Sequence, residues 1–250
     1  MDVFAGQHIW IIGASTGIGR ALAINLSAQG AVLALSARSE AKLADLNDEL
    51  GGTHHVLPFD VSDMDSFVKA TQAIEKTFPS LDSVIHMAAV YAPARLDKMD
   101  IKTVYQMVDV NLKGTLNAIH AILPILKAQK TGQLALCGSV AGYRGLAGGQ
   151  PYSATKAAVI NLAESLRTEH PELDIKVINP GFVRTPLTEK NNFKMPMMIE
   201  PDEAAMAIAK DLRTRKFEIH FPKKFTWIMK FLRALPAPIY FFIAKKMKAE

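Results

Sequence analysis

The stretch Ile9-Trp10-Ile11-Ile12-Gly13-Ala14-Ser15-Thr16-Gly17-Ile18-Gly19 decides the fold of this chain. Its first four residues form an apolar run typical of a buried strand, and the amphipathic stretch 18–29 predicts a helix directly after the glycines. Glycines in such a turn permit a tight bend and let a pyrophosphate approach the backbone at the positive end of the helix. The spacing is GxxxGxG, where the commoner form is GxGxxG. The residues expected to contact a dinucleotide here are Gly13, Ser15, Thr16, Gly17, Ile18 and Gly19.

The same alternation of apolar runs and amphipathic stretches continues along the chain. Further strands are predicted at 31–36, 55–59, 83–87, 133–137, 175–179 and 217–221, and further helices at 40–50, 64–78, about 101–127 and 151–169. Because the strands are apolar throughout, they are expected to be buried on both faces. This rhythm predicts an α/β, Rossmann-like, doubly wound parallel sheet of about seven strands with helices on both faces. No linker divides residues 1–222, which are expected to form one Rossmann-type catalytic domain.

Composition narrows the class of protein. At 250 residues, with 49% hydrophobic and 21% charged residues, the chain is long enough for a substantial globular core. The single cysteine, Cys137, excludes an internal disulfide and a cysteine-rich metal site, and it fits a reducing compartment. Cys137 itself is expected to be a buried strand residue. The N-terminus has neither a basic region nor a long apolar run, so no signal peptide is predicted and a cytoplasmic location is expected.

The end of the second predicted strand, Ser36-Ala37-Arg38, bears on the choice of cofactor. An NAD site usually places an Asp or Glu here to accept from the ribose 2′-hydroxyl, and residues 35–38 contain no acid. The guanidinium of Arg38 can pair instead with a 2′-phosphate, so NADP(H) is favoured over NAD(H). Asp60 and Val61, at the end of the third strand, are expected at the adenine edge.

Tyr152 and Lys156 lie four residues apart, which places both on one face of the helix predicted at 151–169. A phenol has an ordinary pKa of about 10, and a nearby ammonium favours its ionised form. Ser139 follows the fifth strand and precedes Tyr152 by thirteen residues, with four glycines between them. The glycines allow a turn that brings both hydroxyls together at the edge of the sheet where ligands bind.

Taken together, these elements resemble the short-chain dehydrogenases/reductases in their single-domain form of about 250 residues. The resemblance covers residues from about 7 to 222, and its elements are modestly specific alone but highly specific in this order and spacing. In order they are Gly13-x-x-x-Gly17-x-Gly19, Asp60, Asn111, Ser139, Tyr152-x-x-x-Lys156 and Pro180-Gly181-x-Val183-x-Thr185.

The resemblance implies a role for each matching residue. Tyr152 would exchange a proton with the substrate oxygen, Ser139 would orient that oxygen, and Lys156 would lower the Tyr152 pKa and bind the nicotinamide ribose. Asn111 would hold a water that continues the proton relay. The remaining cofactor contacts implied are Ala88, Pro180, Gly181, Val183 and Thr185. Hydride chemistry belongs to the cofactor, while the protein positions, polarises and supplies a proton.

The predicted function is therefore NADP(H)-dependent interconversion of a ketone or aldehyde and an alcohol, on an apolar substrate bound by 90–97, 144–150 and 186–200. The segment 186–200 is either a lid or an ordinary irregular connection. Family members commonly pair through the two long helices, which implies a homo-oligomer, either a dimer or a tetramer. The alternative function is a non-catalytic dinucleotide-sensing or membrane-tethered binding protein on the same fold.

One element departs from the family. Where Asn-Asn-Ala-Gly is usual after the fourth strand, this chain has His86-Met87-Ala88-Ala89. The change removes a hydrogen-bonding asparagine and adds a methyl group at Ala89. We therefore expect an altered cofactor wall, with His86 as a packed rather than a catalytic residue.

The tail, residues 223–250, carries the basic charge of the chain. Its charged residues give +6, which leaves −1 for the rest of a chain whose total is +5: Lys223, Lys224, Lys230, Arg233, Lys245, Lys246, Lys248 and Glu250. At 100° per residue, one helical face is expected to hold Phe225, Ile228, Met229, Leu232 and Leu235, widened by Trp227 and Phe231, with Thr226, Lys230 and Arg233 opposite.

The tail is too often interrupted by prolines and charges to span a bilayer. Such an amphipathic, aromatic and basic segment is suited to a membrane interface, here the cytoplasmic face, and it could also pack on the body or between subunits. It is too apolar for a solvated arm that binds nucleic acid.

Overall fold

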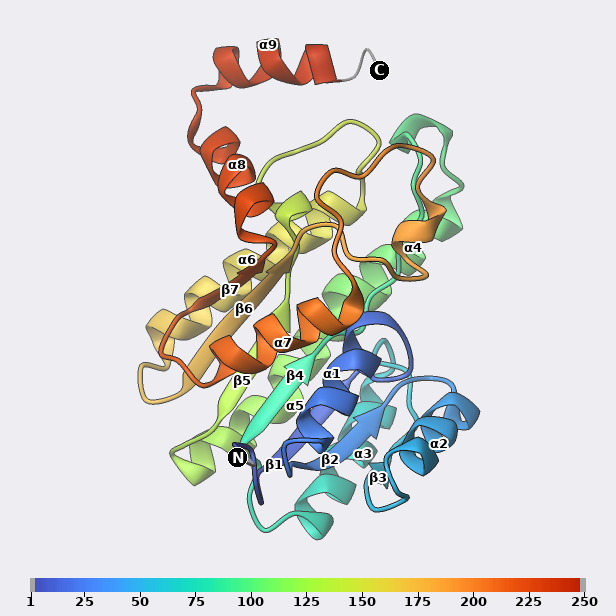
Figure 1. The fold of residues 1–250 in the computed structure, drawn as a ribbon, viewed down its shortest axis with the longest axis vertical. Helices are drawn as coiled ribbons and strands as arrows, with labels where there is room; N and C mark the ends of the chain where they lie inside the picture. Colours follow the sequence, from blue (N-terminus) through green and yellow to red (C-terminus); the bar gives the residue numbers. More distant parts are fainter. Residues whose placement is uncertain (1–2, 248–250) are drawn as a thin grey trace.

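The computed structural model describes residues 3–247 of the chain, and Figure 1 shows their arrangement as a sheet between two layers of helices. The strands are β1 (His8–Ile12), β2 (Val32–Ser36), β3 (His55–Val56), β4 (Ser83–His86), β5 (Gln133–Cys137), β6 (Asp174–Pro180) and β7 (Glu218–Phe221). They form one sheet in the order β3-β2-β1-β4-β5-β6-β7, and every neighbouring pair is parallel. This confirms the predicted doubly wound sheet, whose order reverses between β1 and β4.

Helices cover both faces of the sheet. They are α1 (Gly17–Ser27), α2 (Glu40–Glu49), α3 (Met64–Thr77), α4 (Ile101–Val108), α5 (Gly114–Gln129), α6 (Tyr152–Glu169), α7 (Pro201–Leu212), α8 (Lys223–Ala234) and α9 (Ala237–Met247). The core is split by the sheet into two clusters. Apolar side chains of α3, α5 and α6 pack on one face, and those of α1, α2 and α7 pack on the other.

Two predicted elements take a different form in the structure, and α7 had not been predicted. The third strand is regular only over His55–Val56, although the N–H groups of Leu57 and Phe59 still donate to the carbonyls of Leu35 and Ala37 at 2.9 and 3.1 Å. The helix predicted at about 101–127 begins at Ile101, where the Asp100 carboxylate accepts from the backbone N–H groups of Lys102 and Thr103. It is interrupted by one π-helical turn, η2 (Asp109–Lys113), before it continues as α5. Such turns often occur at functional sites.

The orientation predicted for the first tail helix was partly wrong. In α8 the buried side chains are Phe225, Thr226, Met229 and Leu232, whereas Ile228 is exposed beside Trp227 and Phe231. Thr226 faces the body because its hydroxyl forms a hydrogen bond with His220 Nδ1 at 2.6 Å. Lys230 also faces the body, because its ammonium lies 2.5 Å from Glu218 Oε2. The tail therefore packs on the body through one face of α8. Lys248 and Glu250, counted above in the tail charge, lie outside the described residues.

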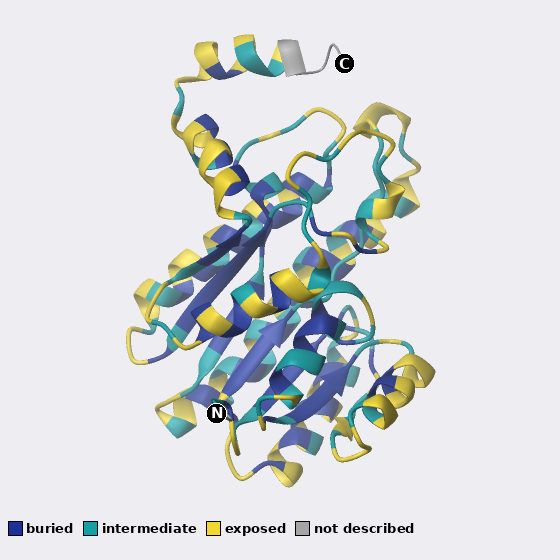
Figure 2. Cartoon of the chain, viewed as in Figure 1, coloured by how far each residue is buried: buried dark blue, intermediate teal, exposed yellow. Residues whose placement is uncertain are grey.

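Figure 2 shows exposed residues along α8 and α9, which stand apart from the sheet at the end that carries the ends of β5 and β6. Among residues 3–247, no helix has the length and apolar character needed to cross a membrane.

Candidate active site and cofactor groove

The turn after β1 is shaped for close backbone approach. Gly13 has φ +95°, and a Cβ atom there would lie 2.6 Å from the backbone nitrogen of Ala88. A Cβ on Gly19 would lie 2.1 Å from the carbonyl oxygen of Gly13. Only glycine fits both positions, so β1, the first turn of α1 and the end of β4 lie in contact. The first turn of α1 holds no acidic residue, which leaves its positive end open to an anion.

The end of β2 brings two cations to the same cavity. Arg38 and Lys42 are exposed and line it, and Ser39 between them caps α2 by accepting from the Lys42 backbone N–H at 3.4 Å. Sequence reasoning found Arg38 but missed Ser39 and Lys42. The signal was present, because a residue three positions after a cap lies in the first helical turn, near the strand end.

Asp60 and Val61 also line this part of the cavity. One oxygen of the Asp60 carboxylate accepts from the backbone N–H and the hydroxyl of Ser62, at 2.9 and 2.7 Å. The Val61 carbonyl accepts from the Asn117 side chain at 2.9 Å. Both groups are thus held in place at the edge of the cavity.

The element that departs from the family pattern, His86-Met87-Ala88-Ala89, begins at the last residue of β4. Ala88 forms the wall against the glycine turn, as predicted, and its methyl side chain packs against the core. His86 is buried and does not line the cavity, which agrees with a packed histidine. Its Nε2 atom has no hydrogen-bond partner among residues 3–247. Burial, and next the nearby Lys156 ammonium, lower the pKa of His86 to about 4.

Asn111 lies in the π-helical turn and is fully buried behind the cavity, which it does not line. Its side-chain oxygen accepts from the Val90 N–H at 2.8 Å, and its side-chain nitrogen donates to the Val90 carbonyl at 2.9 Å. The same nitrogen lies 3.3 Å from the Thr155 hydroxyl on α6. Asn111 therefore joins the segment after β4 to α6, and its role in holding a water stays a prediction.

Ser139, Tyr152 and Lys156 meet at one end of the cavity. The Ser139 oxygen accepts from the Ala141 N–H at 3.1 Å, and the Ser139 side chain also hydrogen-bonds with Tyr152. Lys156 is buried, and its ammonium donates to the Cys137 carbonyl at 2.7 Å, at the end of β5. It lies 5.7 Å from the centroid of the Tyr152 ring.

Burial dominates the electrostatics of these groups. It raises the pKa of the Tyr152 phenol above its ordinary value, and Cys137 adds to the rise while the Ser139 hydroxyl opposes it. Burial lowers the pKa of the Lys156 ammonium and raises that of the Cys137 thiol. The predicted lowering of the Tyr152 pKa by Lys156 is not found here: burial sets the direction of the shift and favours the protonated phenol.

The segment after β6 closes the groove from the other side. Pro180, Gly181, Val183 and Thr185 all line the cavity. A Cβ on Gly17 would lie 3.1 Å from the Thr185 methyl carbon, so this segment lies against the glycine turn. The Thr188 hydroxyl bonds with the Val183 carbonyl at 2.6 Å and accepts from the Thr185 N–H at 3.0 Å, which fixes the local backbone.

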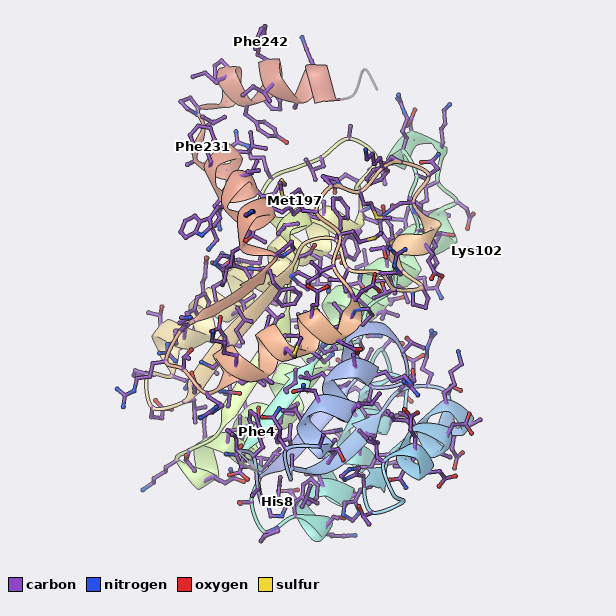
Figure 3. The ribbon with its side chains drawn as sticks, viewed as in Figure 1. Phe4, His8, Lys102, Met197, Phe231 and Phe242 are labelled. Atoms are coloured by element: carbon purple, nitrogen blue, oxygen red, sulfur yellow. The ribbon has the colours of Figure 1, made fainter. Side chains whose placement is uncertain are left out.

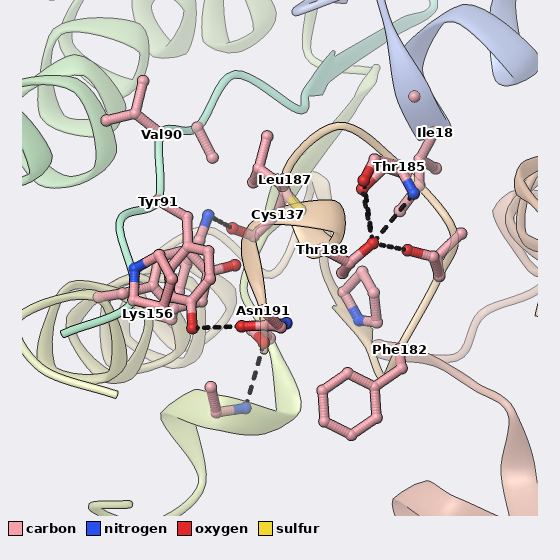
Figure 4. A pocket seen from close by; sticks show the side chains of 18 of the residues that line it. Ile18, Val90, Tyr91, Cys137, Lys156, Phe182, Thr185, Leu187, Thr188 and Asn191 are labelled. Carbon is pink, nitrogen blue, oxygen red and sulfur yellow. Dashed lines mark hydrogen bonds between the residues drawn. The ribbon is translucent and has the colours of Figure 1, made fainter. Parts of the chain in front are cut away.

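Sequence reasoning named the segments 90–97 and 186–200 but missed the bond that joins them. The Tyr91 hydroxyl donates to the Asn191 side-chain oxygen at 2.9 Å, and the Tyr91 ring meets the Tyr152 ring edge-on at 4.9 Å between centroids. The Lys190 ammonium donates to the Tyr91 carbonyl at 2.9 Å. Figure 4 shows this bridge beside Lys156 and Cys137. No local pattern could reveal a contact between residues a hundred positions apart.

All these surfaces belong to one cavity of about 1460 Å³. It is larger than the roughly 300–1,000 Å³ typical of a single drug-sized ligand, so it has room for a dinucleotide and a second molecule. The predicted substrate segments line it with mainly apolar side chains, including Val90, Leu146, Leu187 and Phe193. The glycine cradle, the open helix end and the two cations fit a dinucleotide. Among the site residues predicted from the sequence, Asn111 is the one that does not line the cavity.

Comparison with known proteins agrees with this arrangement. The profile of the short chain dehydrogenase family matches residues 7–196. An uncharacterized oxidoreductase of Myxococcus xanthus is 31% identical over 243 residues, with 95% of this chain and 96% of that protein covered. An uncharacterized oxidoreductase of Staphylococcus epidermidis is 33% identical over 200 residues, with 79% and 87% covered.

Solved structures show the same fold. An alcohol dehydrogenase from the archaeon Thermococcus sibiricus, complexed with 5-hydroxy-NADP, is 29% identical with a TM-score of 0.77 over 86% of this chain and 95% of its own. A short chain dehydrogenase/reductase from Burkholderia phymatum, in complex with NAD, is 22% identical with a TM-score of 0.83 over 91% and 92%. The chain thus belongs to the short-chain dehydrogenase/reductase family of NAD(P)-binding oxidoreductases.

Proposed function

We propose that this protein is an NADP(H)-dependent reductase that converts an apolar ketone or aldehyde to the alcohol, with Tyr152 as proton donor. The observation that carries the proposal is the meeting of Ser139, Tyr152 and Lys156 at one end of a cavity whose other end is the glycine cradle. Catalysis is assigned to residues 1–222. The tail 223–250 contributes Phe225, Met229 and Tyr240 to the cavity wall.

The preference for NADP(H) rests on charge. Arg38 and Lys42 line the cavity at the end of β2, where an acid would be expected for NAD. Two cations can hold a 2′-phosphate by charge-assisted hydrogen bonds. The structure from Thermococcus sibiricus was solved with 5-hydroxy-NADP and that from Burkholderia phymatum with NAD, so the preference rests on the two cations of this chain. The glycine turn, Asp60 and Val61, Ala88 and the segment 180–185 would hold the remainder of the dinucleotide.

The bound reduced nicotinamide would supply the hydride that attacks the carbonyl carbon. The chain's own part is to orient the carbonyl and protonate its oxygen. Ser139, whose side chain hydrogen-bonds with Tyr152, can donate its hydroxyl hydrogen to that oxygen when the substrate binds beside the two hydroxyls. Tyr152, whose pKa is raised by burial, keeps its proton at neutral pH and can release it to the oxyanion as charge develops there.

Lys156 and Asn111 support this step from behind. The Lys156 ammonium is fixed by the Cys137 carbonyl, so its charge stays near the Tyr152 ring and favours the phenolate left after proton transfer. Asn111 acts through Val90 and Thr155, and thereby holds the end of β4 against the helix that carries Tyr152. Asn111 is therefore a positioning residue.

Pairing of two copies through α4 and α5 is part of the proposal. These helices expose Ile101, Tyr105 and Leu116, which are large apolar side chains suited to a subunit contact. The contact would lie on the helix that leads to Asn111.

The alternative function, a non-catalytic dinucleotide-binding protein, draws on the His86-Met87-Ala88-Ala89 element. The decisive experiment is NADPH oxidation over a panel of apolar aldehydes and ketones, with Tyr152→Phe as the matched variant. The reductase predicts turnover by the wild type and a loss of roughly 100-fold or more in Tyr152→Phe, with NADPH binding retained. Cofactor binding without turnover of any carbonyl would favour the alternative.

A further inference from the structure

The two C-terminal helices present opposite faces to two different environments. Toward the body, Phe225 and Met229 of α8 and Tyr240 and Ala244 of α9 line the cavity. Away from the body, the same helices expose Trp227, Phe231, Phe241 and Phe242 to 62%, 65%, 59% and 62% of their full areas. Figure 3 labels Phe231 and Phe242, which point away from the body. The inner face is explained by the active site, whereas these aromatic side chains of the outer face are left largely exposed to solvent.

This outer face, defined as Trp227, Ile228, Phe231, Ile239, Phe241 and Phe242, is the main concentration of exposed aromatic side chains among the described residues. The remaining exposed aromatic side chains among the described residues are Tyr105 and Phe193. Large exposed apolar patches mark interaction sites in soluble domains. The outer face is therefore expected to be covered by something other than this chain.

The charged residues of the tail indicate what kind of surface would cover the outer face. Between Glu218 and Glu250 the sequence has no acidic residue, whereas it has seven basic ones. Three of those on α8 are directed to acids of the body: Lys223 to Asp211, Lys230 to Glu218 and Arg233 to Glu164. Lys224 and Lys245 are exposed at the two ends of the helical pair, and the sequence adds Lys246 and Lys248 beyond them. An anionic surface complements this arrangement.

A second copy of the chain fits the face less well. Two such faces in contact would bring like charges together with no acid from either tail to compensate them, which is unfavourable in a desolvated contact. The exposed apolar residues of α4 and α5 offer a separate place for self-association. An anionic lipid surface satisfies both features, since aromatic rings insert at the headgroup level and basic side chains meet the lipid phosphates.

The two helices that carry the outer face also contact the loop at the substrate end of the cavity. The Tyr240 hydroxyl donates to the Gly145 carbonyl at 2.5 Å, and the Arg144 guanidinium lies 4.4 Å from the centroid of the Tyr240 ring. Arg144 also donates to the Arg233 carbonyl at 3.0 Å. The loop that follows, with Leu146, lines the cavity. A surface that receives α8 and α9 would therefore lie next to the loop that flanks the substrate.

We infer that the outer face of α8 and α9 docks on an anionic membrane, and that the cavity receives its apolar carbonyl substrate from the lipid. The second half rests on the proposed function. The helices lie in the interface plane, since neither has the length to span the bilayer.

Docking is tested by flotation of the full-length protein with phosphatidylcholine vesicles that contain none or roughly 30 mol% phosphatidylserine. We expect the wild type to float with the anionic vesicles, and the double variant Phe231→Ser with Phe242→Ser to float roughly tenfold less or worse. The matched control is Leu96→Ser with Met206→Ser, two exposed apolar side chains on other surfaces, which should float like the wild type.

Tryptophan fluorescence gives an independent measurement of depth. The chain has two tryptophans, and Trp10 is fully buried, so brominated lipid can quench only Trp227 by contact. We expect quenching in anionic vesicles and its loss in Trp227→Phe. Failure of the wild type to float with anionic vesicles overturns the inference. If the double variant then changes the sedimentation mass without lipid, the face is a subunit contact.

Two assays distinguish a failure of substrate delivery from the lipid from a failure of the proposed reductase function. A short water-soluble aldehyde, assayed with NADPH and no vesicles, tests the reductase alone, and the double variant should turn it over like the wild type. A long-chain aldehyde embedded in anionic vesicles should be turned over roughly tenfold more slowly by the double variant. Equal turnover of the embedded aldehyde by both proteins overturns delivery from the lipid.

Discussion

The Lys156 ammonium donates to the Cys137 carbonyl oxygen at 2.7 Å, so the end of β5 fixes the charge beside Tyr152. Replacement of Lys156 by Met removes this charge while it fills much of the same volume. We expect kcat for carbonyl reduction to fall roughly 100-fold or more, because the phenolate formed after proton transfer loses its neighbouring cation. The loss is measured at saturating NADPH, and circular dichroism should still show a cooperative melt.

The matched control is a second buried lysine. Lys176 is fully buried in β6, outside the cavity, where its ammonium donates to the carbonyls of Thr214 and Lys216. Lys176→Met should lower the melting temperature, because it removes two hydrogen bonds and the ion pair of the Lys176 ammonium with Asp174, yet the folded enzyme should keep its turnover. Equal loss of turnover in both variants would contradict a role specific to Lys156.

The pair Arg38 and Lys42 should determine the choice of cofactor. In Arg38→Ala with Lys42→Ala, KM for NADPH should rise roughly tenfold or more, because each charge-assisted bond to a phosphate contributes about 1.5–3 kcal/mol. KM for NADH, which has no 2′-phosphate, should change little. Initial rates with both cofactors measure the ratio. Lys102→Ala, an exposed cation on α4, serves as control, and an unchanged ratio in the double variant would refute the assignment.

The bridge between Tyr91 and Asn191 should contribute to substrate binding. Tyr91→Phe keeps the edge-on ring contact with Tyr152 and removes only the hydrogen bond at 2.9 Å. We expect KM for the carbonyl to rise roughly fivefold with little change in kcat, as befits the loss of one bond worth about 1 kcal/mol. Asn191→Ala should have a similar effect, and the double variant should be no worse than the single ones. Additive effects would show that the two residues act separately.

The fold was predictable because most strands are short, largely apolar runs bounded by turn residues, and because glycines stand at positions 13 and 19, where a side chain would clash. Most of the cavity followed, since ligand-binding residues gather at the carboxyl ends of parallel strands. The orientation of α8 was not predictable in the same way. Helical periodicity gives an apolar face, but Thr226 and Lys230 turn inward because His220 and Glu218 lie opposite them. The Tyr91–Asn191 bridge depends likewise on tertiary placement alone.

His86, which stands where the family usually has asparagine, should make the protein sensitive to acid. Its pKa is lowered to about 4 by burial, and next by the Lys156 ammonium, whereas an unfolded chain takes up a proton near pH 6.5. The folded state therefore binds fewer protons, so its stability is complete above pH 6.5 and is lost as the pH falls toward 4. The shift corresponds to a loss of about 3 kcal/mol across that window.

His86→Asn removes the titrating group and should flatten this decline in urea unfolding. His120→Asn, on the exposed side of α5, should retain it. Because His220 is lowered to about 4 as well, some decline will remain in His86→Asn. A profile in His86→Asn as steep as that of the wild type would place the acid sensitivity elsewhere.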